Sequence, residues 1–177
     1  IQQGVSILLM MVMLPFIKKF GKRNVALVGT IISLGGQILM LLNPTSFTGL
    51  SICSVIKGLG MAPVTATLFA MMADTIEYGH WKTGTRIEGT LYSATTFGAK
   101  LGAGIGMAFA STVLGMAGYN GLVLVQSSSA LSAISNLYLF APIVFMIIVP
   151  ILYLFYKLDK QYPQVIADLI TREKESV

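Results

Sequence analysis

Apolar runs of membrane-spanning length take up most of this sequence. They cover residues 1–17, 24–42, 49–73, 89–118 and 134–157. A helix needs about 20 mostly apolar residues to cross a hydrocarbon core of about 30 Å. The runs are too long and too continuously apolar for the strands of a membrane β-barrel, which alternate between apolar and polar residues. The sequence therefore predicts an all-α integral membrane protein with about five transmembrane helices.

The composition agrees with lipid as the main solvent. Hydrophobic residues make up 55% of the 177 residues and charged residues only 11%, whereas a soluble domain carries roughly 25% charged residues. The net charge of +5 does not indicate nucleic acid, because the basic residues lie beside the apolar runs. A single cysteine, Cys53, excludes an internal disulfide, and a single histidine, His80, excludes a His-rich metal site. We therefore expect no metal and no cofactor.

Basic residues outside the runs mark one side of the membrane. They occur in the connections 18–23 and 74–88 and in the tail, residues 158–177, whereas the connections 43–48 and 119–133 carry no charge. The positive-inside rule predicts that the charged segments are cytoplasmic. Charged and uncharged connections alternate, so five spans from 1 to 157 fit one orientation. The tail is expected to form an amphipathic helix on the cytoplasmic surface.

The first apolar run begins at residue 1 without a flanking or capping residue. Many transporters consist of two six-helix halves related by pseudo-symmetry. We therefore expect the chain to be the last five spans of such a protein, a C-terminal fragment that does not transport alone.

Two lysines lie inside the apolar runs. Lys100 is about twelve residues into the fourth run, which places it about 18 Å from the cytoplasmic end at 1.5 Å per residue. A lysine near the midplane costs about 2.5–3.5 kcal/mol, so it usually faces a wet cavity or a partner. Helical spacing places Thr96 one turn away. Lys57, in the third run, is closer to the outer face, where its side chain could instead extend to the surface.

Small and helix-breaking residues interrupt the third and fourth runs. The third contains Gly58-Leu-Gly-Met-Ala-Pro63, which indicates either a kinked helix beside a substrate path or the ordinary Gly and Pro content of spanning helices. The fourth has glycines at 98, 102 and 106, a spacing that favours close helix packing.

The segment that joins the third and fourth runs resembles a known family. It reads Ala-Asp-Thr-Ile-Glu-Tyr-Gly-His-Trp-Lys-Thr-Gly-Thr-Arg-Ile-Glu-Gly from residue 73 to 89, followed by Tyr92-Ser93 and Phe97-Gly-Ala-Lys100. It is similar to the loop between helices ten and eleven of the glycoside–pentoside–hexuronide:cation symporters, a branch of the major facilitator superfamily that includes the melibiose carriers. The segment 15–23 also resembles the superfamily's basic loop motif after helix eight.

This resemblance implies a fold and a function. The chain would be the C-terminal helical bundle of a major facilitator superfamily transporter, equivalent to helices eight to twelve, in the inner cell membrane. The implied activity is symport of a sugar or glycoside with a cation, Na⁺ or H⁺, by alternating access. The implied partners are the sugar, the lipid bilayer and the N-terminal half, which holds most of the family's cation ligands.

The resemblance also implies site residues. Lys100 and Thr96 match helix-eleven positions beside the sugar and cation sites, and Thr65 stands where melibiose-type members have Trp. Residues of the segment 74–88 match the family residues that form a gate at the cytoplasmic side. His80 stands in this segment where many members of the family have Glu. The full predicted set is Lys100, Thr96, Thr65, Tyr92 and Lys57 for substrate and coupling, and Asp74, Glu77, Tyr78, Lys82, Arg86 and Glu88 for the gate.

Other functions stay open at this stage. A related carrier could move a non-sugar solute, and a membrane scaffold could pack through the glycines of the fourth run without transporting anything. An enzyme is not expected, because the sequence shows no Ser-His-Asp set and no pair of carboxylates within the apolar runs. For the gate, the acidic residues of 74–88 are expected to pair with Lys82, Arg86 or the basic segment 18–23.

Overall fold

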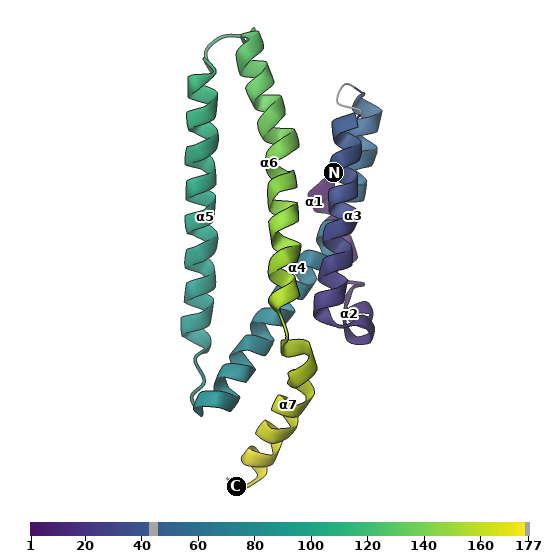
Figure 1. The fold of residues 1–177 in the computed structure, drawn as a ribbon, viewed down its shortest axis with the longest axis vertical. Coiled ribbons are helices and arrows are strands. Elements are labelled where there is room, and N and C mark those ends of the chain that lie inside the picture. The colour runs from purple at the N-terminus through teal and green to yellow at the C-terminus, as the bar shows by residue number, and fades with distance from the viewer. Residues whose placement is uncertain (43–45, 176–177) are drawn as a thin grey trace. The chain divides into compact units, whose positions relative to one another are not determined.

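The computed structural model describes residues 1–42 and 46–175, without the side chains of Glu173 and Glu175. Throughout these residues the secondary structure is helical, and no strand occurs among them (Figure 1). The helices are α1 (Gln2–Met10), α2 (Leu14–Phe20), α3 (Lys22–Leu42), α4 (Phe47–Thr83), α5 (Glu88–Met116), α6 (Ser128–Phe155) and α7 (Leu158–Glu175).

The predicted fold class is confirmed. Four helices, α3 to α6, are long and apolar enough to cross a membrane, and α1 with α2 makes a fifth candidate if the bent pair is one span. Residues 43–45 of the predicted connection 43–48 lie outside the described residues. The chain divides into two compact units, residues 1–88 with 145–177, and residues 89–144.

The first predicted span, 1–17, is broken rather than continuous. α1 ends at Met10, and α2 begins at Leu14 with its axis turned by 68°. Pro15 lies in the first turn of α2. Backbone N–H groups in the first turn have no partner within the helix, so the N–H that proline lacks is not missed there. In a continuous helix the same proline would remove a hydrogen bond and clash with the preceding turn. The proline therefore favours a new helix at this point.

The segment 74–88, expected to be a loop, is mostly helix. α4 extends through it to Thr83 and ends at Gly84, whose φ of 71° and N–H bond to the His80 carbonyl form a left-handed C-cap. Only residues 84–87 connect α4 to α5. Pro63 lies inside α4 without ending it, so the third run is one continuous helix. α6 likewise begins at Ser128, earlier than the predicted 134.

Glycines allow α3 and α4 to approach closely in the first unit. A Cβ on Gly60 would lie 2.4 Å from the backbone N of Ser33 and 2.5 Å from the carbonyl O of Gly29. A Cβ on Gly29 would in turn lie 2.6 Å from the carbonyl O of Gly60. No side chain fits at either position, so the two backbones are in direct contact here.

Two further contacts complete this packing. Gly36 of α3 makes room for Lys57, because a Cβ there would lie 3.0 Å from Lys57 Cγ. Gly58 of α4 faces α1, where a Cβ would lie 2.8 Å from the Gln2 carbonyl, and Ser6 donates a hydrogen bond to the Gly58 carbonyl at 3.0 Å. α4 is therefore the central helix of this unit, with α1 and α3 both packed on it.

The second unit consists of α5 and the first part of α6, which run antiparallel (Figure 1). Within this unit no α5 residue is buried. A Cβ added at Gly98, Gly102 or Gly106 would meet no atom within 4 Å. Among the described residues, close helix packing at glycines is seen between α3 and α4 and between α1 and α4, and the packing role of the α5 glycines stays a prediction.

A matched pair of glycine substitutions tests this packing. Gly60→Ala places a methyl group against backbone atoms that cannot move separately, so α3 and α4 must shift apart at a cost of about 1–3 kcal/mol. Gly35→Ala, on α3 but with no atom within 4 Å of its Cβ, should leave stability unchanged or raise it slightly. Thermal unfolding of the full-length protein in detergent is the measurement, and equal melting temperatures of the two variants would contradict this packing.

Candidate functional site

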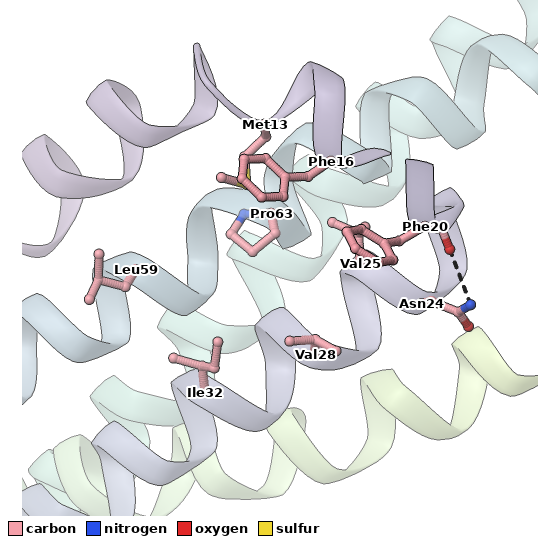
Figure 2. A pocket seen from close by; sticks show the side chains of 9 residues that line it. All are labelled: Met13, Phe16, Phe20, Asn24, Val25, Val28, Ile32, Leu59 and Pro63. Carbon is pink, nitrogen blue, oxygen red and sulfur yellow. Dashed lines mark hydrogen bonds between the residues drawn. The ribbon is translucent and has the colours of Figure 1, made fainter. Parts of the chain in front are cut away.

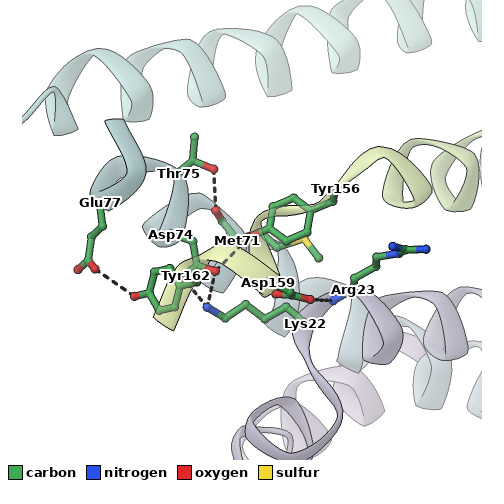
Figure 3. Close-up of polar contacts among 9 residues, drawn as sticks. All are labelled: Lys22, Arg23, Met71, Asp74, Thr75, Glu77, Tyr156, Asp159 and Tyr162. Atoms are coloured by element: carbon green, nitrogen blue, oxygen red, sulfur yellow. Dashed lines mark hydrogen bonds and ion pairs between the residues drawn. The ribbon is translucent and has the colours of Figure 1, made fainter. Parts of the chain in front are cut away.

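A buried carboxylate lies at the centre of a polar cluster in the first unit (Figure 3). Asp74, on α4, is only 1% exposed, and it forms an ion pair with Lys22 at the start of α3. The hydroxyl of Tyr156, just after α6, donates to Asp74 Oδ2 at 3.0 Å. A buried charge is costly unless it is paired and hydrogen-bonded. Asp74 meets both conditions with donors from two other segments of the chain.

Tyr162 of α7 connects this ion pair to a second carboxylate. Its ring lies 4.4 Å from Lys22 Nζ, measured to the ring centroid, and its hydroxyl donates to Glu77 Oε2 at 3.1 Å. Burial, the hydrogen bond to Glu77 and the nearby charge of Asp74 together raise the pKa of the Tyr162 phenol above its ordinary value. Tyr162 therefore stays protonated and keeps donating to Glu77 at physiological pH.

Asp159, at the start of α7, caps the start of α3. Its Oδ2 accepts a hydrogen bond from the backbone N–H of Arg23 at 2.8 Å. A carboxylate at this end is favoured by the helix dipole and by the unpaired N–H groups of the first turn. Gly21 precedes the helix with a φ of 81°, and a Cβ there would lie 3.4 Å from the same Asp159 oxygen. The turn between α2 and α3 is thus held by the C-terminal segment.

The rest of α7 is attached to the end of α4. Trp81 Nε1 donates to Asp168 Oδ2 at 2.9 Å, and Arg172 Nη1 donates to the Trp81 carbonyl at 2.9 Å. Val165 is buried. Beside these contacts α4, α7 and the connection after α4 enclose a small cavity of about 160 Å³, which Glu77, His80 and Arg86 line together with the apolar face of α7. The tail is therefore helical as expected from its sequence, and it packs on α4.

The predicted gate residues lie in this region, and the two ion pairs seen there are among the pairings expected from the sequence. Arg86 pairs with Glu88 at 2.6 Å, and both side chains are largely exposed, at 60% and 46%. Lys82 lies near the Tyr78 ring, at 5.9 Å from its centroid. Asp74 is paired with Lys22 of the basic segment 18–23. α4 continues past residue 73 to Thr83, so Asp74 faces α3 from within the helix, whereas Arg86 lies in the connection 84–87 and Glu88 begins α5.

Five functional candidates were missed from the sequence. They come from the end of α6 and from α7, and they are Tyr156, Asp159, Tyr162, Asp168 and Arg172. The amphipathic pattern of the tail predicted a helix with one apolar face. It carried no signal for the partner of that face, because Val165 fits a lipid surface as well as a protein surface.

The predicted substrate and coupling residues fall in both units. Tyr92, Thr96 and Lys100 are exposed on α5, in the second unit. Lys57 and Thr65 belong to α4, in the first unit, where the Thr65 hydroxyl donates to the Met61 carbonyl at 3.0 Å. Lys57 is only 5% exposed, because Gly36 leaves space for its stem. The position of Lys57 near the outer end of its span had suggested that its side chain could extend to the surface. In the structure the side chain is buried instead.

Apolar helices of spanning length and a polar cluster at one end define a multi-pass membrane protein. Residues 4–160 match the family model described as MFS/sugar transport protein. The chain therefore belongs to this family of the major facilitator superfamily, in agreement with the resemblance seen in the sequence.

Curated relatives agree with this assignment. The isoprimeverose transporter of Lactiplantibacillus pentosus is 38% identical over 157 residues, which are 86% of this chain and 32% of that protein. The glucuronide carrier protein homolog of Escherichia coli (strain K12) is 30% identical over 164 residues, 89% of this chain and 35% of the relative. A putative sulfoquinovose importer of Salmonella typhimurium is 34% identical, over 89% of this chain and 34% of the relative. The chain spans about a third of the length of these relatives.

A pair of double-mutant cycles distinguishes the buried ion pair from the exposed one. Lys22→Gln and Asp74→Asn should each lower stability, and their coupling free energy should be about 0.5–3 kcal/mol because both remove one shared, shielded interaction. The cycle of Arg86→Gln and Glu88→Gln should show a coupling below about 1 kcal/mol, as exposed pairs do. Unfolding of the full-length protein is the measurement. Equal coupling in the two cycles would contradict the burial of the Lys22–Asp74 pair.

Proposed function

We propose that the chain is the C-terminal part of a sugar or glycoside:cation symporter that works by alternating access. Family membership over residues 4–160 is the observation that carries this proposal. The names of the relatives, an isoprimeverose transporter and a glucuronide carrier homolog among them, support a sugar-type substrate. The rest of the carrier would supply the other half of the substrate cavity and the site for Na⁺ or H⁺.

The orientation follows from the basic residues. The segments 18–23 and 74–88 and the tail carry the basic residues outside the spans, so we assign them to the cytoplasmic side of the cell membrane. The cluster around Asp74 then lies at the cytoplasmic end of the helices. A polar cluster at that depth can close the substrate path to the cytoplasm in one state and open it in another.

We assign the gate to this cluster, with Asp74 as its central residue. The carboxylate binds Lys22 of α3 and Tyr156 of the α6–α7 connection, so separating these segments must break both interactions. Glu77 is held by Tyr162 in the same way. Tyr78, Lys82, Arg86 and Glu88 complete the gate as its more exposed members. These interactions shift the equilibrium between the closed and the open state only by the amount by which they stabilise one state more than the other.

The substrate and coupling residues are assigned by their position and chemistry. Lys100 and Thr96 are one helical turn apart on α5, and Tyr92 lies one further turn toward the start of that helix. An ammonium group at mid-membrane depth requires a polar surrounding, which a water-filled substrate path supplies. Lys57 and Thr65 place two more polar groups on α4. We assign all five to the substrate and coupling path.

The charge of Lys100 favours one subclass of substrate as a second candidate. Putative sulfoquinovose importers and putative 2,3-dihydroxypropane-1-sulfonate exporters are among the relatives, and a sulfonate or a sugar carboxylate carries a negative charge that an ammonium group can bind. An anionic sugar, or a small anionic solute that is not a sugar, would then be the cargo. A neutral glycoside would need Lys100 only as a hydrogen-bond donor.

Uptake by the full-length protein tests the function and the role of Lys100 together. Radiolabelled neutral glycosides, pentosides and hexuronides are offered with and without a Na⁺ gradient or a pH gradient. We expect accumulation of at least one sugar that depends on a cation gradient. Lys100→Ala should abolish accumulation at normal expression, whereas Lys160→Ala, an exposed lysine of α7, should retain it. Lys100→Arg should preserve uptake of an anionic substrate better than Lys100→Gln does.

Two results would overturn these assignments separately. Uptake that depends on neither the Na⁺ gradient nor the pH gradient would contradict symport, although the protein would still be a carrier. Full accumulation by Lys100→Ala would move Lys100 from the transport path to a structural role.

Hydrogen–deuterium exchange tests the gate. Lys22→Gln leaves Asp74 with a single donor and favours the open arrangement, so amides in residues 74–83 and 158–170 should exchange several-fold faster. Arg86→Gln, which removes only an exposed pair, should leave that exchange nearly unchanged. The ratio of inward to outward transport rates should shift with Lys22→Gln. A variant with wild-type exchange and wild-type rates in both directions would exclude Lys22 from the gate.

A further inference from the structure

An apolar cavity of about 450 Å³ lies in the first unit, apart from the Asp74 cluster (Figure 2). Its walls come from α2, α3, α4 and the residue before α2, and include Phe16, Phe20, Val28 and Pro63. Asn24 is the one lining residue with a polar side chain, and its amide donates to the Phe20 carbonyl at 3.1 Å. A cavity of this size and lining suits a hydrocarbon chain, since water would find few partners in it.

The cavity is open on the outer side of these helices. Val28 and Ile32 of α3 are 56% and 40% exposed, and Phe16 and Phe20 of α2 are about half exposed. α3 is apolar enough to cross a membrane, so its exposed apolar side chains require an apolar surrounding. The 68° bend between α1 and α2 turns α2 away from the line of a straight span, which leaves the hollow beside α3.

Positive charge lies at one end of the cavity. Lys18 and Lys19 occupy the last turn of α2 and are exposed. Lys19 Nζ lies 5.4 Å from the ring centroid of Phe20, a residue of the cavity wall. Neither lysine has an acidic partner among the described residues. A lipid with a negative headgroup pairs both charges while its chain fills the hollow.

We propose that this cavity binds an acyl chain of an anionic phospholipid, whose headgroup phosphate binds Lys18 and Lys19. The lipid would lie against the turn between α2 and α3, next to Lys22 and Arg23, and so beside the gate. The site itself depends on the cavity and its charges and not on the transported substrate.

Photo-crosslinking in nanodiscs tests this site directly. The full-length protein is reconstituted with phosphatidylglycerol that carries a diazirine on one acyl chain, and crosslinked peptides are located by mass spectrometry. The same lipid is present in both leaflets, so the result does not depend on the assigned orientation. We expect crosslinks on residues 13–32, and far fewer from a phosphatidylcholine analogue of the same chains.

Two kinds of variant separate the headgroup from the chain. Lys18→Gln with Lys19→Gln should reduce phosphatidylglycerol crosslinking about five-fold for each lysine, whereas Lys160→Gln with Lys174→Gln removes as much charge from α7 and should not. Val28→Phe should fill the cavity and lower crosslinking at residues 13–32, while Ile31→Phe, exposed on α3 but outside the cavity wall, should not.

Each contrary outcome overturns the proposal. Equal labelling by the two lipids would show that the charges do not select the headgroup. No labelling at residues 13–32 would show that protein covers the cavity in the full-length carrier. Labelling that survives both Val28→Phe and the loss of the two lysines would show nonspecific contact with bulk lipid.

Discussion

The direct contact between the backbones of α3 and α4 is the constraint on which the rest of the first unit depends. Gly29 and Gly60 meet where no Cβ fits on either helix. The two helices run antiparallel, so contacts pair later residues of α3 with earlier residues of α4, as Gly36 with Lys57 and Lys22 with Asp74. The glycine contact therefore fixes the register that brings Lys22 opposite Asp74. A larger separation of the helices would leave the carboxylate without its cation.

That ion pair in turn explains why the C-terminal segment belongs to the site. A single lysine does not satisfy the acceptor capacity of a buried carboxylate, which has about four lone-pair positions. Tyr156 supplies another donor to Asp74, and Asp159, three residues on, caps α3 beside Lys22. The first turn of α3 is therefore held at Lys22 by a residue 52 positions away and at Arg23 by a residue 136 positions away in sequence. Movement of α7 and movement at the start of α3 are physically coupled through these bonds.

Much of the fold was predictable from the sequence because lipid imposes simple rules on composition. Long apolar runs predicted the apolar parts of α3, α4 and α5 to within a few residues. The sequence of residues 73–89 indicated the family that the family model then matched. The break at residues 11–13 was missed, because Pro15 after an apolar run can start a helix as easily as it can lie in one. The extension of α4 to Thr83 was missed for a different reason. Charged residues outside the membrane were interpreted as a loop, although Glu, Lys, Tyr and Trp all form helix once packing supports them.

The site was harder to predict, because its pairing depends on distances that sequence patterns do not contain. Asp74 and Glu77 were identified, but their partners were expected among Lys82, Arg86 and the whole of segment 18–23. The lysines of that basic segment have different surroundings in the structure. Lys22 is shielded and paired with Asp74, whereas Lys18 and Lys19 are exposed and have no acidic partner among the described residues.

The positive-inside rule counts these three lysines alike, and yet their energetic roles must differ. A mostly shielded cation beside a buried carboxylate affects the arrangement of the helices, whereas exposed cations at the end of a helix interact with the charge of the surrounding lipid. Lys19 and Lys22 are separated by less than one helical turn of sequence, with Gly21 between them, so the exposed charge and the paired charge lie on either side of one short turn. Under the lipid site proposed above, this short connection makes the lipid composition a physical input to the position of α3, independent of any substrate.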